Sequence, residues 1–267
     1  MDYRTIYIQR TGPVITLYLN RPEVMNVLSN EMREELINFM HQAAQDNDIR
    51  VVILSAKGKA FSAGADLDEF KRTYENFKSG DDANEFGNPD FWKAFTDFPK
   101  PMIAAINGLA VGFGFTVTLT CDIRIASERA KFSCAFARIG VTPEFGSSYF
   151  MPRLIGSGKA AEMAFTGRMI DAHEAAEIGL VNQIVKPENL ILESEKMAQR
   201  ISRMPAEAIK MTKLLLRNGC HSNLEQVLNY ESSVFRYCTR TQNHYEAVCE
   251  AIKTINKKKE LSRDEAK

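Results

Sequence analysis

The spacing of apolar side chains changes twice near the start of the chain. In TIYIQRTGPVITLYLNRP, residues 5–22, apolar and polar side chains alternate on either side of a Thr-Gly-Pro turn, which predicts two strands. Residues 30–46 place apolar side chains at the three-and-four spacing of a helix, among them Met32, Leu36 and Ala43. The β-branched run IRVVILSA, residues 49–56, then predicts a short buried strand.

The rest of the chain continues this alternation and then becomes helical. Three more short apolar runs predict strands: PMIAAIN, DIRIAS and AKFSC. Small-residue stretches occupy 57–66 and 107–114, and the second leads into an apolar helix, while 67 to about 98 mixes helix and turn. From about 147 onward the pattern is helical, interrupted by one strand, LVNQIVK. Strands that alternate with helices predict an α/β fold with parallel pairing, followed by a small all-α C-terminal region.

Composition narrows the function classes. Among the 267 residues, Lys+Arg and Asp+Glu both total 34, and this neutrality argues against a nucleic-acid or anionic-membrane partner. No apolar run approaches the roughly 18 residues of a membrane span, and MDYRTIYIQR lacks the plan of a signal peptide, so we expect a cytoplasmic protein. The five cysteines form no C-x-x-C pair and are expected to be reduced core thiols.

Three loops follow predicted strands at their carboxyl ends: 57–66, 107–114 and 137–147. This edge is where α/β proteins usually bind ligands. Neither glycine-containing loop completes a Walker or dinucleotide-binding motif. Small residues at the entry to a helix leave backbone N–H groups free, and two such groups from different loops can hold one developing negative oxygen. Spacing alone leaves open the alternative that both are simply tight strand-to-helix turns.

The third loop, within RIGVTPEFGSSYFMPRLIG, places Glu144 between a proline and a Phe-Gly-Ser-Ser turn. An isolated loop carboxylate is usually solvated, but apolar neighbours can also make such a residue a buried acid or base. A serine hydrolase is disfavoured because no G-x-S-x-G elbow is present. No metal-ligand spacing is present either, so we predict no metal.

Several motifs together resemble the crotonase (enoyl-CoA hydratase/isomerase) superfamily, in order and spacing, over roughly residues 4–258. They are NRPEVMNVLS, GKAFSAGADL, PMIAAINGLAVGFGF followed by CDIRIAS, and FTGRMIDAHEAAEIGLVNQIV. The resemblance implies a spiral of β-β-α turns, with an acyl-CoA-binding catalytic core in residues 1–200. It also implies a helical oligomerisation region in 201–267, forming a homotrimer or a hexamer made of two trimers. Coenzyme A would be part of the substrate, with no separate cofactor.

The resemblance also implies roles for individual residues. The backbone N–H groups of Ala65 and Phe113 would form an oxyanion hole for the thioester carbonyl, and the backbone around Ala63 and Ala65 would hold the adenine. The remaining residues expected to bind substrate are Asp66, Leu67, Phe136 and Ile139. Residues that often hold the CoA phosphates in the family are replaced by Val24 and Asp68, and possible substitutes are Lys57, Lys59, Lys71 and Arg72.

The two catalytic glutamates of a family hydratase correspond here to Thr116 and Phe136, which disfavours hydration. The Glu144 region instead resembles the peroxisomal-type Δ3-Δ2-enoyl-CoA isomerases, in which a single glutamate follows the proline. The resemblance therefore implies that Glu144 takes a proton from C2 of a 3-enoyl-CoA and returns it to C4. Alternatives are a thioester hydrolase, a weak hydratase or a non-catalytic acyl-CoA-binding scaffold. Glu231, on the last predicted helix, is a second buried-acid candidate, with a structural role favoured.

Overall fold

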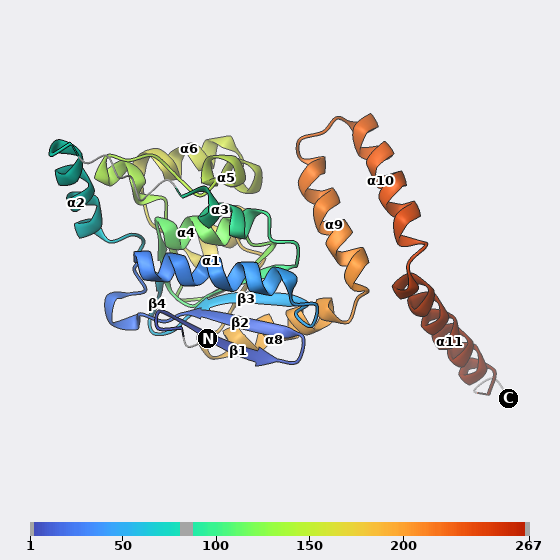
Figure 1. Ribbon diagram of the computed structural model, residues 1–267. Coiled ribbons are helices and arrows are strands. Elements are labelled where there is room, and N and C mark those ends of the chain that lie inside the picture. Colours follow the sequence, from blue (N-terminus) through green and yellow to red (C-terminus); the bar gives the residue numbers. More distant parts are fainter. Residues whose placement is uncertain (1–2, 81–87, 265–267) are drawn as a thin grey trace. The chain divides into compact units, whose positions relative to one another are not determined.

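The larger sheet forms because apolar runs that are far apart in sequence pair with one another. The computed structural model describes residues 3–80 and 88–264, and Figure 1 shows their course. Six strands pair in the order β1-β2-β3-β5-β7-β10. The first two are antiparallel, as the hairpin pattern predicts, and the other pairs are parallel. Their bounds are β1 (Ile6–Thr11), β2 (Val14–Leu19), β3 (Val51–Ala56), β5 (Met102–Ile106), β7 (Ile123–Ser127) and β10 (Gln183–Val185).

A second sheet joins four very short strands in the order β4-β6-β8-β9. They are β4 (Ala60–Ser62), β6 (Leu109–Val111), β8 (Lys131–Ser133) and β9 (Ile170–Asp171). The sequence pattern assigns β4 to a loop and β6 to a turn, and both assignments are wrong. Strands of three residues have no readable period of their own, and they form here because β4 and β8 pair with the two sides of β6.

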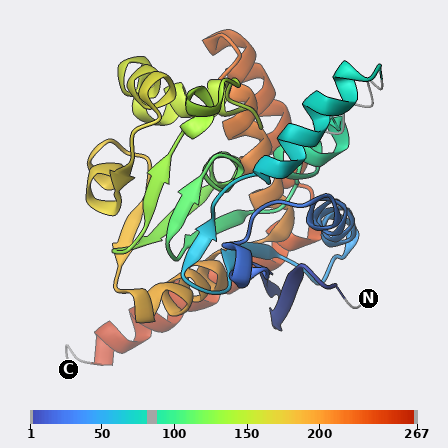
Figure 2. The same ribbon diagram turned by 90° about the vertical axis from the view of Figure 1, so that its left-hand side faces the viewer.

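Three strands of the second sheet, β4, β6 and β8, each follow a strand of the first, and a helix comes next, whereas β9 follows the helix α6. The sequences β3-β4-α2 and β5-β6-α4 are two such β-β-α turns, and β7-β8 leads through a 3-10 segment (Ala135–Ile139) to α5. The helices of this part are α1 (Asn30–Gln45), α2 (Leu67–Lys78), α3 (Pro89–Thr96), α4 (Phe113–Leu119), α5 (Ser147–Ile155), α6 (Ser157–Thr166), α7 (Ala172–Glu177) and α8 (Leu190–Ser202). Figure 2 shows helices on several sides of the strands, and in Figure 1 α2 stands apart from them. The fold is therefore α/β, as the residue pattern predicts, and it is the spiral of β-β-α turns that the family resemblance implies.

The helix α1 illustrates how local sequence fixes an element. Ser29 caps its start, because its side chain accepts a hydrogen bond from the backbone N–H of Met32. The apolar residues at helical spacing, including Leu36 and Ala43, are all buried against the core.

The chain divides into two compact units, residues 1–199 and 200–267, one residue before the predicted boundary. The second unit contains α9 (Ala206–Gly219), α10 (Leu224–Cys238) and α11 (Gln242–Asp264). Glu231 is exposed on α10, so its assignment as a buried acid is wrong for the single chain. The helix α10 packs on α9, and Val234 is the one residue of α10 that this packing leaves buried.

The cysteines meet the prediction only in part. Cys121 and Cys134 are buried, but Cys220 is exposed on the second unit, so it is not a core thiol. None of the helices in the described part of the chain is long and apolar enough to cross a membrane.

Candidate active site

Two glycine contacts bring the first two candidate loops together. Gly114, in the first turn of α4, lies so close to β4 that an added Cβ would lie 2.5 Å from the carbonyl oxygen of Ser62. A Cβ on Gly64, whose φ is +105°, would lie 3.1 Å from the carbonyl oxygen of Val111. Only glycine permits both approaches. The loop that carries Ala65 is therefore held directly against the loop that carries Phe113.

The backbone N–H groups of Ala65 and Phe113 remain available in this arrangement. Phe113 is the first residue of α4, where an N–H has no partner within the helix. Gly112 precedes it with φ +52°, a conformation that favours glycine. Within residues 3–80 and 88–264, neither of the two N–H groups has a hydrogen-bond acceptor. They are free to donate to a ligand oxygen.

The loop that carries Glu144 is fixed by its own backbone. The Ser147 N–H and hydroxyl both donate to the carbonyl oxygen of Glu144, at 3.0 Å and 2.6 Å. Phe145 follows with φ +56°, an unusual conformation for a bulky residue, and its side chain is buried. This strained turn points successive side chains in different directions, with Phe145 in the core and Glu144 at the cavity.

Thr116 holds the Glu144 carboxylate. The Thr116 hydroxyl, which is fully buried on α4, donates to Glu144 Oε1 at 2.6 Å. Burial raises the pKa of the Glu144 carboxyl above its ordinary value, and the Thr116 hydrogen bond and the positive charge of Arg33 offset part of that rise. Glu144 is thus a partly buried carboxylate with raised basicity, not a solvated loop residue.

The nearby thiol of Cys134 is not a nucleophile. Burial, together with the charge of Glu144, raises the pKa of Cys134 to about 11, so the thiol stays protonated at neutral pH.

A cavity of about 560 Å³ in the first unit brings most of the predicted site residues together. Ala63, Ala65, Leu67, Phe113, Phe136, Ile139 and Glu144 all line it. Leu67 and Ile139 are 62% and 49% exposed, so they belong to its mouth. Asp66 is the exception, because its side chain accepts from the N–H of Asp68 and caps α2.

The wall next to Glu144 is aromatic. The rings of Phe113 and Phe145 each lie within 6 Å of the Phe91 ring, at 5.6 Å and 5.1 Å between centroids. The Phe113 side chain is therefore packed into this cluster, while its N–H stays free. Such a wall accepts an apolar or unsaturated ligand group and excludes water from the carboxylate.

Sequence reasoning missed Arg33, which also lines this cavity from α1. The available signal was its position: Arg33 lies three and seven residues before Leu36 and Met40, on the buried face of the helix. The candidates for phosphate binding lie elsewhere. Lys59, Lys71 and Arg72 are exposed, and Lys57 lies over the Tyr18 ring at 3.8 Å.

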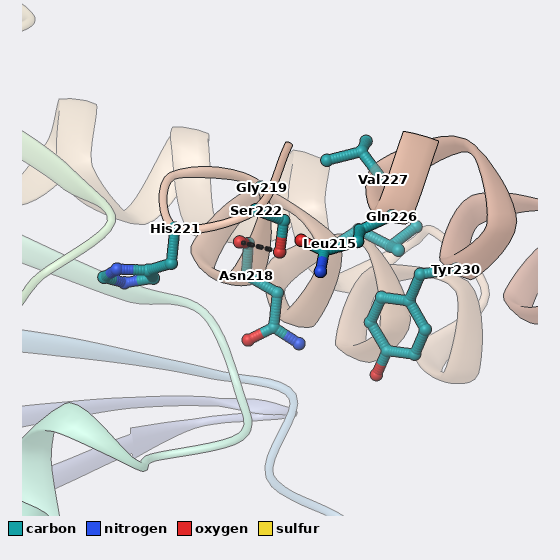
Figure 3. Close-up of a pocket in the computed structure, with 8 residues that line it drawn as sticks. All are labelled: Leu215, Asn218, Gly219, His221, Ser222, Gln226, Val227 and Tyr230. Carbon is teal, nitrogen blue, oxygen red and sulfur yellow. Dashed lines mark hydrogen bonds between the residues drawn. The ribbon is translucent and has the colours of Figure 1, made fainter. Parts of the chain in front are cut away.

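A second hollow, of about 340 Å³, lies in the second unit between α9 and α10 (Figure 3). It is lined by Leu215, Asn218, Gly219, His221, Ser222, Gln226, Val227 and Tyr230, and none of the predicted site residues is among them. The described residues contain no group of three or more His, Cys, Asp or Glu side chains that could hold a metal ion.

Fold and site together define a spiral α/β protein with a carboxylate and two free backbone N–H groups at one apolar cavity. Residues 9–258 match the family model for enoyl-CoA hydratase/isomerase. The chain is 34% identical to a short-chain-enoyl-CoA hydratase of Clostridium acetobutylicum, over 93% of this chain and 94% of that protein. It is 32% identical to a 1,2-epoxyphenylacetyl-CoA isomerase of Escherichia coli, over 88% and 90% of the two chains. The crystal structure of an enoyl-CoA hydratase from Bacillus anthracis superposes with a TM-score of 0.83 at 31% identity, covering 94% of this chain and 96% of that one.

The chain belongs to the enoyl-CoA hydratase/isomerase family, within the crotonase superfamily. Its named relatives include both hydratases and an isomerase, so the choice between these reactions depends on the residues of this site.

Proposed function

We propose that this protein is a Δ3-Δ2-enoyl-CoA isomerase. The observation that carries the proposal is that Glu144 is the one carboxylate lining the cavity within the described residues, and that Thr116 binds it from a hydratase glutamate position. The other hydratase glutamate position holds Phe136, which is buried and cannot transfer protons. One carboxylate is too few for hydration, which uses one group on water and another on carbon, but suffices to move one proton.

In the proposed reaction, the N–H groups of Ala65 and Phe113 donate to the thioester oxygen of a 3-enoyl-CoA. The Glu144 carboxylate removes a proton from C2, and the C–H electron pair forms the C1=C2 bond of a dienolate whose negative oxygen the two N–H groups stabilise. Protonated Glu144 then delivers the proton to C4. The C3=C4 pair forms the new C–H bond, the C1=C2 pair becomes C2=C3, and the carbonyl is restored.

The raised pKa of Glu144 suits both halves of this cycle. A carboxylate of ordinary acidity is a poor base toward carbon, whereas a partly desolvated one takes the proton more readily and still releases it to C4. Because Thr116 binds Oε1, the other carboxylate oxygen, Oε2, is the one expected to carry the proton between the two carbons.

The test is conversion of a 3-enoyl-CoA to the conjugated 2-enoyl-CoA, followed by absorbance, with wild type and Glu144→Gln. We expect the substitution to lower kcat at least about a hundredfold, the usual contribution of a general acid–base group. Glu231→Gln is the matched control, since Glu231 is an exposed glutamate of the second unit, and it should keep wild-type activity. Isomerisation that survives Glu144→Gln would rule out this base.

The names of the relatives favour a second candidate, hydration of a 2-enoyl-CoA. The same preparation should therefore be given a 2-enoyl-CoA, and loss of its absorbance without isomerisation of the 3-enoyl isomer would replace the proposal with hydratase activity. Release of free CoA thiol would indicate a thioester hydrolase. Binding of CoA thioesters without any turnover would indicate a scaffold.

A further inference from the structure

The cavity contains a buried cation that the isomerase mechanism does not use. The Arg33 side chain is only 10% exposed, yet it lines the same cavity as Glu144. Its guanidinium makes one hydrogen bond within the described residues, to Oδ1 of Asn30 on its own helix. It also lies 5.9 Å from the centroid of the Phe91 ring.

Glu69 forms an ion pair with Arg33 but accepts no hydrogen bond from its guanidinium. The closest approach is 3.7 Å, from Arg33 Nη2 to Glu69 Oε1, which is an ion pair but too long for a hydrogen bond. Glu69 reaches Arg33 from α2 and is not among the residues that line the cavity. A guanidinium has five N–H donors, so Arg33, which lines the cavity and makes one hydrogen bond within the described residues, keeps donors that a ligand can use.

An acyl chain made only of carbon and hydrogen fits this arrangement poorly. Filling the cavity with such a chain would remove water from the guanidinium and return no acceptor, which is costly for a buried charged group. A ligand oxygen beside Arg33 would replace the lost water. On the basis of the proposed acyl-CoA function, we infer that the acyl group carries a neutral oxygen substituent, a hydroxyl or a carbonyl beyond C4, that accepts a hydrogen bond from Arg33.

The charges around Arg33 favour a neutral oxygen over a carboxylate. Glu69 and Glu144 both act on this one guanidinium, the first through the ion pair and the second across the cavity. A ligand carboxylate would bring a third negative charge to a single buried cation. Arg138, the other basic residue lining the cavity, is exposed and remains hydrated. A hydroxyl or carbonyl adds an acceptor and no net charge.

Arg33 also has a simpler possible role, in which it only ties α2 to α1. Glu69 is the one buried residue of α2, so loss of the pair would loosen that helix. This role predicts that replacing Arg33 weakens the binding of every ligand to the same degree. Recognition of an oxygen predicts a loss of affinity only for oxygenated ligands. The two roles are separable by comparing ligands on one variant.

The test is calorimetric binding of saturated acyl-CoAs, which cannot isomerise: hexanoyl-CoA, 5-hydroxyhexanoyl-CoA, 6-hydroxyhexanoyl-CoA and adipoyl-CoA. We expect wild type to bind at least one hydroxyacyl-CoA about tenfold more tightly than hexanoyl-CoA, as for a hydrogen bond to a charged group. Arg33→Met, of similar length but without donors, should lose this preference and bind hexanoyl-CoA at least as tightly as wild type does, because the desolvation cost of the guanidinium is gone. Glu69→Gln retains Arg33 and removes a negative charge, so it should keep the preference and bind adipoyl-CoA more tightly than wild type does.

Equal binding of hexanoyl-CoA and both hydroxyacyl-CoAs by wild type would overturn the inference, and this result needs no variant to fold. An equal loss of affinity for all four ligands in Arg33→Met would also overturn the inference, and Arg33 would then serve only to hold α2 to α1. If wild type binds adipoyl-CoA more tightly than the other three ligands, the group that Arg33 binds is a carboxylate and the inference of a neutral oxygen is wrong. Because no turnover is measured, a preference for hydroxyacyl-CoA in a protein that fails to isomerise 3-enoyl-CoA would keep this inference and reject only the isomerase.

Discussion

At the scale of single residues, Glu144 owes its chemistry to a neighbour that is distant in sequence. Its partner Thr116 lies 28 residues away, on the helix whose first N–H is the proposed oxyanion donor. The Thr116 hydroxyl oxygen also lies 3.3 Å from the carbonyl oxygen of Phe113, but its single proton serves the shorter hydrogen bond of 2.6 Å to Glu144. In the sequence, Thr116 is only the residue that stands in place of a hydratase glutamate. In the fold, its hydroxyl donates a hydrogen bond to Glu144.

Replacing Thr116 with valine tests this connection. Valine has nearly the same shape but no hydroxyl, so the hydrogen bond that lowers the pKa of Glu144 is lost and that pKa rises further. Glu144 acts first as a base and must be ionised, so the acid limb of the pH–rate profile should move to higher pH. We expect kcat at neutral pH to fall roughly tenfold to a hundredfold, the range for loss of a hydrogen bond to a charged group.

The measurement is kcat for isomerisation from acid to neutral pH, with Thr116→Ser as the control. Serine keeps the hydroxyl and should keep the wild-type acid limb. An unchanged acid limb in Thr116→Val would show that this hydroxyl does not control the ionisation of Glu144.

At the scale of elements, the site depends on how closely one β-β-α turn packs on the next. The helix α4 begins against β4, and the contact at Gly114 sets the distance between the loops that carry Ala65 and Phe113. Both loops could be predicted at the carboxyl ends of strands, because each follows a recognisable apolar run. The strands β4 and β6 could not be predicted, since their hydrogen bonds come from each other and from β8.

Gly114→Ala should therefore separate the two loops. The added methyl group would meet Ser62 at 2.5 Å to its carbonyl oxygen, so the backbone must shift. We expect a loss of about 1–3 kcal/mol in the free energy of unfolding, together with lower kcat. Gly158→Ala in α6 is the matched control, because no atom lies within 4 Å of the added methyl group.

Urea denaturation of both variants provides the measurement. Gly158→Ala should be neutral or more stable by up to about 1 kcal/mol, because alanine favours a helix more than glycine does. Equal stability of the two variants would mean that the contact between Gly114 and Ser62 imposes no constraint.

At the scale of the whole molecule, the second unit exposes many large apolar side chains. Leu216, Leu224 and Phe235 are 70%, 73% and 72% exposed on α9 and α10. Large apolar side chains exposed in this way are typical of a surface that binds another protein. Their exposure supports the predicted homotrimer or hexamer, in which these helices would be the contact region.

Charges placed at these exposed apolar positions test the prediction. We expect wild type to have the mass of a trimer or hexamer by light scattering, and Leu216→Glu combined with Phe235→Glu to shift it toward the monomer. The physical reason is that burying an unpaired carboxylate in an apolar interface costs several kcal/mol, on the order of the penalty for unpaired buried charges. Tyr74→Glu, at a 63% exposed apolar position of the first unit, is the control and should not change the mass. A monomeric wild type would contradict the oligomer prediction.

The sequence by itself determined what depends on local periodicity and on motifs. The alternation in residues 5–22 set the hairpin β1-β2, and the helical spacing from Met32 to Ala43 set the buried face of α1. The motifs identified the family and the residues that line the cavity, with Asp66 as the exception. These features could be read in sequence because each is encoded within a short stretch of chain.

Only the tertiary structure decided which side chains meet across long stretches of chain. In the folded chain, the Thr116 hydroxyl donates to Glu144, and Arg33 of α1 lines the cavity. Glu231, by contrast, is exposed. The physical reason is that burial, and with it the pKa of a carboxylate or the pairing of a guanidinium, depends on what packs around the group. The residues that pack around such a group come from elements far apart in the sequence, and local sequence patterns do not predict the relative positions of those elements.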